Sequence, residues 1–166
     1  ALLVKLDSPG PVFYCQKRMG LDARPFQMLK FRSMRADAEQ DTGPVWATKD
    51  DPRRTSFGAF IRRYSLDELP QFINVLVGDM SLVGPRPERP EFVDSLSLRY
   101  PYFRLRSAIR PGITGWAQVR YGYVNDIEGF EEKLALDLYY MRHRSLLMDV
   151  AILWQTVKTV VLFRGI

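Results

Sequence analysis

The sequence predicts a single α+β domain that is mostly helical and has a small antiparallel β-hairpin near its N-terminus. Two segments that favour β-structure, residues 12–20 and 26–34, flank the turn-like stretch LDARP, an arrangement typical of a hairpin. Most of the remaining chain has apolar residues at helical spacing. Because no linker divides the 166 residues, we expect one domain over 1–166 with one core.

Helices are expected after the hairpin. Segment 35–55 is polar and rich in turn residues, so a helix-like beginning followed by a surface loop is predicted. Ser56 is the candidate N-cap of a helix over 56–64, where apolar residues recur at helical spacing. Residues 70–80 begin with proline and reach Gly78 after one apolar run, which predicts a short buried helix that ends at the glycine.

The second half of the chain alternates breaks and helices. Three prolines make 82–92 a stiff extended connector. Residues 91–109 are predicted to be helical with a break near Pro101, and 110–119 form a loop punctuated by glycine. The long segment 126–163 is predicted to form two helices or one bent helix.

Charge narrows the classes of function. The chain has 24 lysines and arginines against 19 acidic residues, a formal net charge of +5. Much of the excess is arginine, whose planar guanidinium matches phosphate oxygens two at a time. Candidate partners are therefore nucleic acid, anionic lipid head groups and phosphorylated small molecules, and a basic surface without a partner is the alternative.

Cysteine and histidine are scarce. The single cysteine, Cys15, excludes a disulfide framework or a cysteine-based zinc site within one chain. The single histidine, His143, lies in a basic stretch that favours a solvated helix surface. Glycine-rich phosphate-loop and dinucleotide fingerprints are absent, and the aromatic residues form no RNA-binding motif, so no nucleic-acid partner is expected.

The stretch SLDELPQ combines two conflicting helix starts. Ser65 and Glu68 have the spacing of a capping box, but that frame places Pro70 inside the helix, where it removes a backbone hydrogen bond. A helix that starts at Pro70 has Leu69 as its cap, which is a poor capping residue. Local rules tend to break at functional sites, so the stretch is either a kinked helix start or part of a site.

Asp67 and Glu68 are the candidate catalytic residues. An ionised Asp67 is able to act as a nucleophile toward phosphorus or carbon, and a positive helix end favours its ionised form. Adjacent side chains on a helix point about 100° apart. The two carboxylates therefore share one metal ion only if the backbone bends, and Pro70 offers a place for that bend.

Three cations are candidate phosphate ligands. Arg86 lies between Pro85 and Pro87, which fix the backbone and limit the reach of its guanidinium. A side chain that is already aimed loses less entropy on binding. Lys30 and Arg32 project from one face of the second predicted strand, which suits a diphosphate. A solvated connector and a wet strand face are the alternatives.

Together these motifs resemble a known family. The stretches KFRSM, RRYSLDELPQFINVLVGDMSLVGPRP and RPGITGWAQV occur in the order seen in bacterial sugar transferases, the monotopic phosphoglycosyl transferases that start surface-glycan synthesis. The resemblance covers nearly the whole chain. PGITGWAQV and DLYYMRHRSLLMD resemble the larger members, which initiate exopolysaccharide or O-antigen repeat units.

The resemblance implies transfer of a sugar-1-phosphate from a UDP-sugar to undecaprenyl phosphate, with release of UMP and formation of an undecaprenyl-diphosphate-sugar. It implies Mg²⁺ as cofactor and a covalent phosphosugar–aspartate intermediate. Asp67 would attack the β-phosphate, and Glu68 would help with the metal or the acceptor, so both carboxylates are candidate metal ligands. Arg86 would hold phosphate, with Arg62 and Lys30 at basic positions of the same pattern.

The resemblance also implies a catalytic domain at the cytoplasmic face of the bacterial inner membrane, and a homodimer. Family members carry an apolar anchor just before SPGPVFY, and residues 1–6 and Asp7 precede it here, so we expect most of that anchor to be missing from this chain. The apolar stripe of 146–163 lies at the membrane interface or packs into the core.

A non-catalytic scaffold that keeps the fold and binds nucleotide sugar or partner proteins is the competing hypothesis. The intact Asp67–Glu68 pair and the PRP motif argue against it. The pattern does not specify the sugar. Donor specificity is predicted to lie in the loop 36–55 and in 119–130, including Arg120, Tyr121 and Tyr123.

Overall fold

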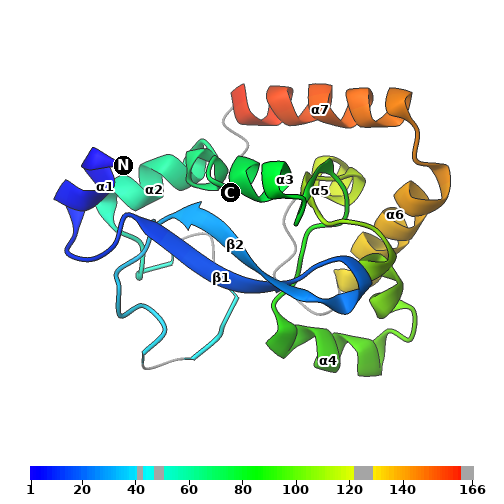
Figure 1. The fold of residues 1–166 in the computed structure, drawn as a ribbon, viewed down its shortest axis with the longest axis horizontal. Helices are drawn as coiled ribbons and strands as arrows, with labels where there is room; N and C mark the ends of the chain where they lie inside the picture. Colours follow the sequence, from blue (N-terminus) through cyan, green and yellow to red (C-terminus); the bar gives the residue numbers. More distant parts are fainter. Residues whose placement is uncertain (41–42, 47–50, 122–128, 162–166) are drawn as a thin grey trace.

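The computed structural model describes residues 1–40, 43–46, 51–121 and 129–161, and these form the expected α+β arrangement in which helices predominate (Figure 1). The chain begins with a short helix, α1 (Leu2–Asp7). The predicted hairpin follows: β1 (Phe13–Met19) pairs antiparallel with β2 (Pro25–Phe31), in a register that places Cys15 opposite Leu29. The hairpin prediction is confirmed.

The segment after the hairpin begins differently from the prediction. Its described residues 35–40 form turns rather than a helix. The backbone pairs across the loop instead, because the Arg35 N–H donates to the Arg53 carbonyl at 3.0 Å. These contacts hold the beginning and the end of the 35–55 segment together.

Helix α2 (Ser56–Arg63) forms where predicted, but its cap is one residue earlier. The Thr55 hydroxyl accepts a hydrogen bond from the Gly58 N–H at 3.0 Å, so Thr55, not Ser56, is the N-cap. The Asp7 carboxylate accepts a second N–H, from Phe57, at 3.2 Å. The start of α2 is therefore fastened to the end of α1.

Helix α3 (Gln71–Val77) ends at Gly78 as predicted, with the glycine at φ 89°. The prediction that the helix is buried is wrong, because Leu76 and Val77 are 87% and 67% exposed. Its buried face is polar: the Asn74 side chain donates to the Gln27 carbonyl at 2.8 Å and accepts from the Leu29 N–H at 3.0 Å. These bonds satisfy the free edge of β2 and turn the apolar face outward.

A second sheet was not predicted. Strand β3 (Ser81–Val83) pairs in parallel with β4 (Gly112–Thr114), and α5 (Trp116–Tyr121) follows at once, so the predicted loop at 110–119 is wrong. A Cβ atom at Gly112 would lie 2.1 Å from the Gly84 nitrogen, so glycine is needed for this close approach. Three-residue strands are too short to show a period in the sequence.

Helix α4 (Pro90–Arg99) and the 3₁₀ helix η3 (Phe103–Ala108) flank the predicted break at Pro101. The last long segment contains two helices, α6 (Phe130–His143) and α7 (Leu146–Val161). Helix α6 joins two apolar clusters: Phe130 and Leu134 pack with α4 and η3, and Tyr140 packs with β3 and Ile152 of α7. Its inward face also carries two charged residues, Lys133 and Asp137.

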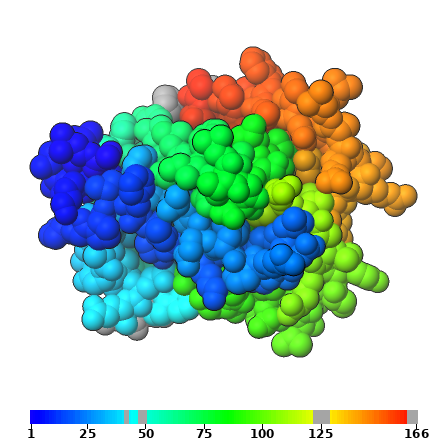
Figure 2. Space-filling model, viewed as in Figure 1, coloured from blue at the N-terminus to red at the C-terminus, as the bar shows by residue number. Residues whose placement is uncertain are grey.

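Helix α7 lies along one edge of the molecule, beyond α3 (Figures 1 and 2). Ile152 is its fully buried residue, and Leu153 packs beside it. The rest of the predicted stripe is 54% to 84% exposed: Leu146, Leu147, Val150, Trp154, Val157 and Val161. Within the described ranges, no helix combines the length and apolarity needed to cross a bilayer.

Candidate active site

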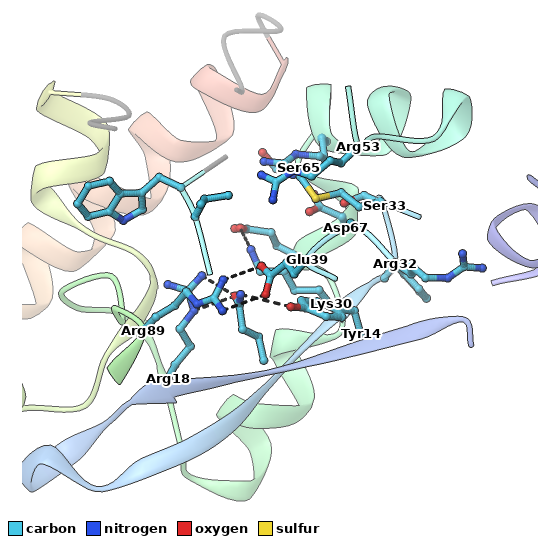
Figure 3. Close-up of a pocket in the computed structure, with 18 of the residues that line it drawn as sticks. Tyr14, Arg18, Lys30, Arg32, Ser33, Glu39, Arg53, Ser65, Asp67 and Arg89 are labelled. Carbon is cyan, nitrogen blue, oxygen red and sulfur yellow. Dashed lines mark hydrogen bonds and ion pairs between the residues drawn. The ribbon is translucent and has the colours of Figure 1, made fainter. Parts of the chain in front are cut away.

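A pocket of about 440 Å³ opens between the hairpin, the 33–46 segment and the start of α6 (Figure 3). Its lining includes nine lysines and arginines but four carboxylates, which suits an anionic ligand. The six predicted site residues all line this pocket: Lys30, Arg32, Arg62, Asp67, Glu68 and Arg86. Residues far apart in the sequence are thus brought to one place, as a site requires.

A short 3₁₀ helix, η2 (Leu66–Glu68), presents the two candidate catalytic carboxylates. Ser65 precedes it at φ 54°, a left-handed conformation that residues other than glycine seldom adopt. The capping box is not formed, because the Ser65 side chain makes no capping bond and the Glu68 carboxylate turns into the pocket. Pro70 then lies at the N-cap of α3, so the chain bends between two helices and both carboxylates reach one pocket.

Glu68 is clamped by two cations. Its Oε1 accepts from Lys30 Nζ at 2.7 Å and from Arg86 Nη2 at 2.5 Å, and its Oε2 accepts from Arg86 Nη1 at 3.3 Å. Burial alone would raise the pKa of Glu68, but Arg86 and Lys30 outweigh it and hold the pKa well below its usual range. Glu68 is therefore ionised and held in place. Its carboxylate occupies the position between Lys30 and Arg86 in which a phosphate group would contact the same two cations.

Asp67 is in a different state. It is 6% exposed, and no ion pair or side-chain hydrogen bond joins it to another described residue. Burial raises the pKa of the Asp67 carboxyl, while the charges of Lys30, Arg62 and Arg86 oppose that rise. The expectation that a positive helix end keeps Asp67 ionised is therefore incomplete: η2 is a single turn, and the opposing charge comes from side chains.

Most other charges of the pocket are paired with each other. Glu39 binds both terminal nitrogens of Arg89 at 2.6 and 3.0 Å, and Glu88 accepts from Lys133 at 2.5 Å. Arg62 is an exception, because its guanidinium forms no ion pair with the part of the chain that the structure describes. Among the described residues that line the pocket, Asp67 and Arg62 are thus a carboxylate and a cation that remain available to a ligand.

Arg32 lines the pocket, but its guanidinium binds the N-terminal segment. Its guanidinium donates to the carbonyls of Pro11 and Ser8 at 2.6 and 2.8 Å and to the Ser8 hydroxyl, so it holds the N-terminal segment against β2. In Figure 3 the Arg32 side chain points away from the other labelled groups. This geometry assigns Arg32 a structural contact and gives no support to a contact with phosphate.

Both predicted specificity segments contribute residues to the pocket, the second through Phe130. Trp46, Glu39 and Arg53 of the 36–55 segment line the pocket. Arg120 instead covers the Trp116 ring, 4.3 Å from its centroid, and is not among the lining residues. Tyr123 and the rest of 122–128 lie outside the described residues.

The carboxylates present fit a magnesium ion only together with a ligand. Mg²⁺ in phosphate-transfer sites is commonly held by one or two carboxylates, water and the phosphates of the substrate. In the described ranges, no three His, Cys, Asp or Glu side chains are grouped closely enough to hold a metal by themselves. Asp67 has free oxygens, whereas Glu68 becomes a metal ligand only by giving up a contact with Lys30 or Arg86.

Comparison with known proteins decides the family. A family model described as bacterial sugar transferase matches residues 1–163. The chain belongs to the bacterial sugar transferase family. Among the sugar transferases it resembles, the UDP-N-acetylgalactosamine-undecaprenyl-phosphate N-acetylgalactosaminephosphotransferase of Aeromonas hydrophila is 48% identical over 160 residues, covering 96% of this chain and 38% of the relative.

Two further relatives cover nearly the same share of this chain. The UDP-glucose:undecaprenyl-phosphate glucose-1-phosphate transferase of Escherichia coli (strain K12) is 46% identical over 159 residues, which are 95% of this chain and 34% of the relative. The exopolysaccharide production protein PSS of Rhizobium leguminosarum bv. phaseoli is 42% identical over 168 residues, 95% of this chain and 81% of the relative. This chain therefore spans little more than a third of the first two relatives.

Proposed function

We propose that this chain is the catalytic part of an enzyme that transfers a sugar-1-phosphate from a UDP-sugar to undecaprenyl phosphate. UMP is released, and an undecaprenyl-diphosphate-sugar is the product, which serves as the first lipid-linked intermediate of a surface glycan. One observation carries the proposal: in a cation-lined pocket, Asp67 is a carboxylate without an ion pair to any described residue. Membership of the sugar transferase family supports it.

The reaction uses Asp67 twice. Its carboxylate oxygen attacks the β-phosphorus of the UDP-sugar, and the bond from that phosphorus to the oxygen bridging to the α-phosphorus breaks, so UMP leaves. A phosphate oxygen of undecaprenyl phosphate then attacks the same phosphorus and releases the carboxylate. One carboxylate thereby serves a water-soluble donor and a lipid acceptor in turn.

The cations supply what such a transfer needs. Phosphoryl transfer depends mainly on positioning and on neutralising charge on the phosphate oxygens. Arg62 carries a guanidinium without an ion pair to a described residue, and the diphosphate takes Lys30 and Arg86 from Glu68 as it enters. Each phosphate oxygen then replaces a carboxylate oxygen of the same charge.

Magnesium fits this exchange. Asp67 and the donor phosphates would hold the ion, joined by Glu68 once the diphosphate has released it from Lys30 and Arg86. The ion would neutralise charge on the phosphate oxygens. A homodimer stays a prediction.

With this lipid acceptor, the enzyme would work at the cytoplasmic face of the inner membrane. Support comes from two exposed apolar surfaces, the outward face of α3 and the stripe of α7. On α3 the exposed apolar residues are Phe72, Ile73, Leu76 and Val77, and α3 follows η2 closely along the chain. Insertion of this face would bring a polyprenyl phosphate head group close to Asp67.

A donor screen tests the function. UDP-sugars are offered with detergent-dispersed undecaprenyl phosphate and Mg²⁺, and UMP release is measured with and without chelator. We expect UMP release with at least one UDP-sugar and none from Asp67→Asn. If UDP-sugars bind while neither protein releases UMP, the scaffold hypothesis is favoured. Normal turnover by Asp67→Asn would contradict the proposed mechanism.

A further inference from the structure

Each backbone carbonyl of the segment from Pro85 to Glu88 accepts a hydrogen bond from another element. Its two prolines have no N–H, so the segment cannot join a regular ladder and its carbonyl groups need donors from other elements. Four successive carbonyls each have one: Gly112 N donates to Pro85 O at 3.0 Å, Arg106 Nη2 to Arg86 O at 2.8 Å, Arg18 Nη1 to Pro87 O at 2.9 Å, and Met19 N to Glu88 O at 2.9 Å.

One of these donors belongs to a buried ion pair. Arg106 lies in η3, and its Nε donates to Asp137 Oδ2 of α6 at 2.7 Å. The two side chains are 6% and 2% exposed. Neither lines the pocket, so neither is placed to touch a ligand there. Arg106 reaches the lining of the pocket by its hydrogen bond to the peptide oxygen of Arg86, and its charge also acts on the buried Glu88.

The Arg106–Asp137 ion pair determines the orientation of the Arg86 carbonyl in addition to any stabilisation it provides. A buried ion pair is often no more stabilising than apolar residues of similar volume, so stability alone is a weak reason for it. A planar guanidinium whose Nε–H donates to Asp137 and whose Nη2–H donates to the Arg86 carbonyl sets where that carbonyl lies. The Arg86 Cα, and with it the guanidinium that enters the pocket, follows the carbonyl.

We propose that Arg106 and Asp137 are positioning residues for Arg86, aiming its guanidinium at the diphosphate of the donor. The inference rests on the proposed function, in which Arg86 binds that diphosphate. It assigns a part in donor binding to two residues that lie outside the pocket.

A double-mutant cycle on the full chain tests this inference, with UDP as the probe and calorimetry as the readout. The variants are Arg106→Gln, Arg86→Gln and their combination. Arg104→Gln is the matched control, because Arg104 lies in the same 3₁₀ helix and its ion pair with Asp94 is exposed at 57% and 80%. A thermal unfolding midpoint confirms that each variant is folded at the assay temperature.

Arg106→Gln is expected to raise the Kd of UDP roughly tenfold. Affinity falls by about this factor when a residue that supports a ligand-binding side chain is removed. Arg104→Gln leaves the Kd unchanged, and the double variant binds as weakly as Arg86→Gln alone. Should Arg106→Gln fail to fold, Arg106→Lys keeps the charge opposite Asp137 but lacks the fork. Arg106→Lys is expected to weaken UDP binding less than Arg106→Gln does, and again only when Arg86 is present.

Two results would overturn the inference and are distinguishable. If the Arg106 and Arg86 effects on the Kd multiply in the double variant, Arg106 does not act through Arg86, and the proposed function is untouched. If Arg86→Gln binds UDP like the unmodified protein, Arg86 does not hold the diphosphate. That outcome removes both this inference and the phosphate contact in the proposed function.

Discussion

Replacing Glu68 with glutamine should tighten the binding of UDP when no metal is present. In the free protein Glu68 holds the two cations that the diphosphate is proposed to use, through contacts of 2.7 Å to Lys30 and 2.5 Å to Arg86. A ligand that takes over these cations has to break both contacts first. Glutamine has nearly the same shape but no charge, so less is lost when it is displaced.

The size of the effect follows from those two contacts. A hydrogen bond between charged groups has a net value of about 1.5 to 3 kcal/mol, and a neutral one about 1 kcal/mol. Taking the lower figure, the carboxylate contacts sum to about 3 kcal/mol, and the glutamine oxygen keeps one cation at about 1 to 1.5 kcal/mol. The difference of about 1.5 to 2 kcal/mol corresponds to a Kd lower by roughly tenfold to thirtyfold.

Calorimetric titration with UDP in the presence of a chelator measures this change. Asp67→Asn is the matched control. It removes a carboxylate from the same pocket, but one that forms no hydrogen bond or ion pair with Lys30 or Arg86. A general effect of charge predicts similar gains for the two variants, whereas displacement predicts a clearly larger gain for Glu68→Gln. A Kd for Glu68→Gln that is unchanged, higher, or no lower than that of Asp67→Asn would refute the reasoning.

Three further predictions concern acid stability, the pH profile and the membrane. Burial favours the protonated form of Glu88, but Lys133 and Arg106 lower its pKa from 4.5 to about 2. Its ionised form therefore adds roughly 3 kcal/mol of stability above pH 4.5, and this contribution is lost as the pH falls toward 2. In denaturant titrations, the free energy of unfolding of Glu88→Gln should differ most from that of the unmodified protein at neutral pH, and a constant difference down to pH 2 would contradict this. Because burial raises the pKa of Asp67 and the nucleophile has to be ionised, the acid limb of kcat/KM for UMP release should lie above pH 3.8, and a limb at or below that value would count against Asp67. Leu76→Ser should weaken sedimentation with anionic vesicles by roughly tenfold to a hundredfold, at about 1.5 to 3 kcal/mol for a leucine that leaves water; Leu98 of α4 is equally exposed, 89% against 87%, and equal losses from Leu98→Ser would argue against α3 as the membrane face.

The parts of the fold that local sequence determines were predictable. The hairpin follows from two β-favouring runs around a turn, and α3 ends at Gly78 because a left-handed residue is needed there. The orientation of α3 was not predictable, since it depends on Asn74 meeting β2 more than forty residues away. Pattern reasoning places apolar faces inward, and here the polar face has the stronger partner.

The candidate site shows the same division. Asp67, Glu68 and Arg86 were found through motifs, and the structure brings them into one pocket with Lys30 and Arg62. Sequence did not reveal that Glu68 closes the gap between two cations, because its contacts span 38 and 18 positions along the chain. The structural contacts of Arg32 were missed for a related reason: alternation gives the face of a strand, but not which loop covers it.

The positioning pair had only a weak signal in the sequence. Arg106 occupies a 3₁₀ helix between two breaks, and Asp137 is one of several acidic residues on α6. A charged residue on the inward face of an otherwise apolar stripe was the available hint, and Lys133 and Asp137 both have that spacing relative to Phe130 and Leu134. Only their partners in space distinguish them from solvated charges.

The central claim is that Asp67 carries the phosphosugar between donor and acceptor. Mass spectrometry of the protein after incubation with a UDP-sugar and Mg²⁺, without acceptor lipid, tests it directly. The account predicts a mass increase of one sugar phosphate that maps to the peptide containing Asp67, disappears when undecaprenyl phosphate is added, and is absent from Asp67→Asn. An adduct on another residue, or its persistence in Asp67→Asn, would contradict the account.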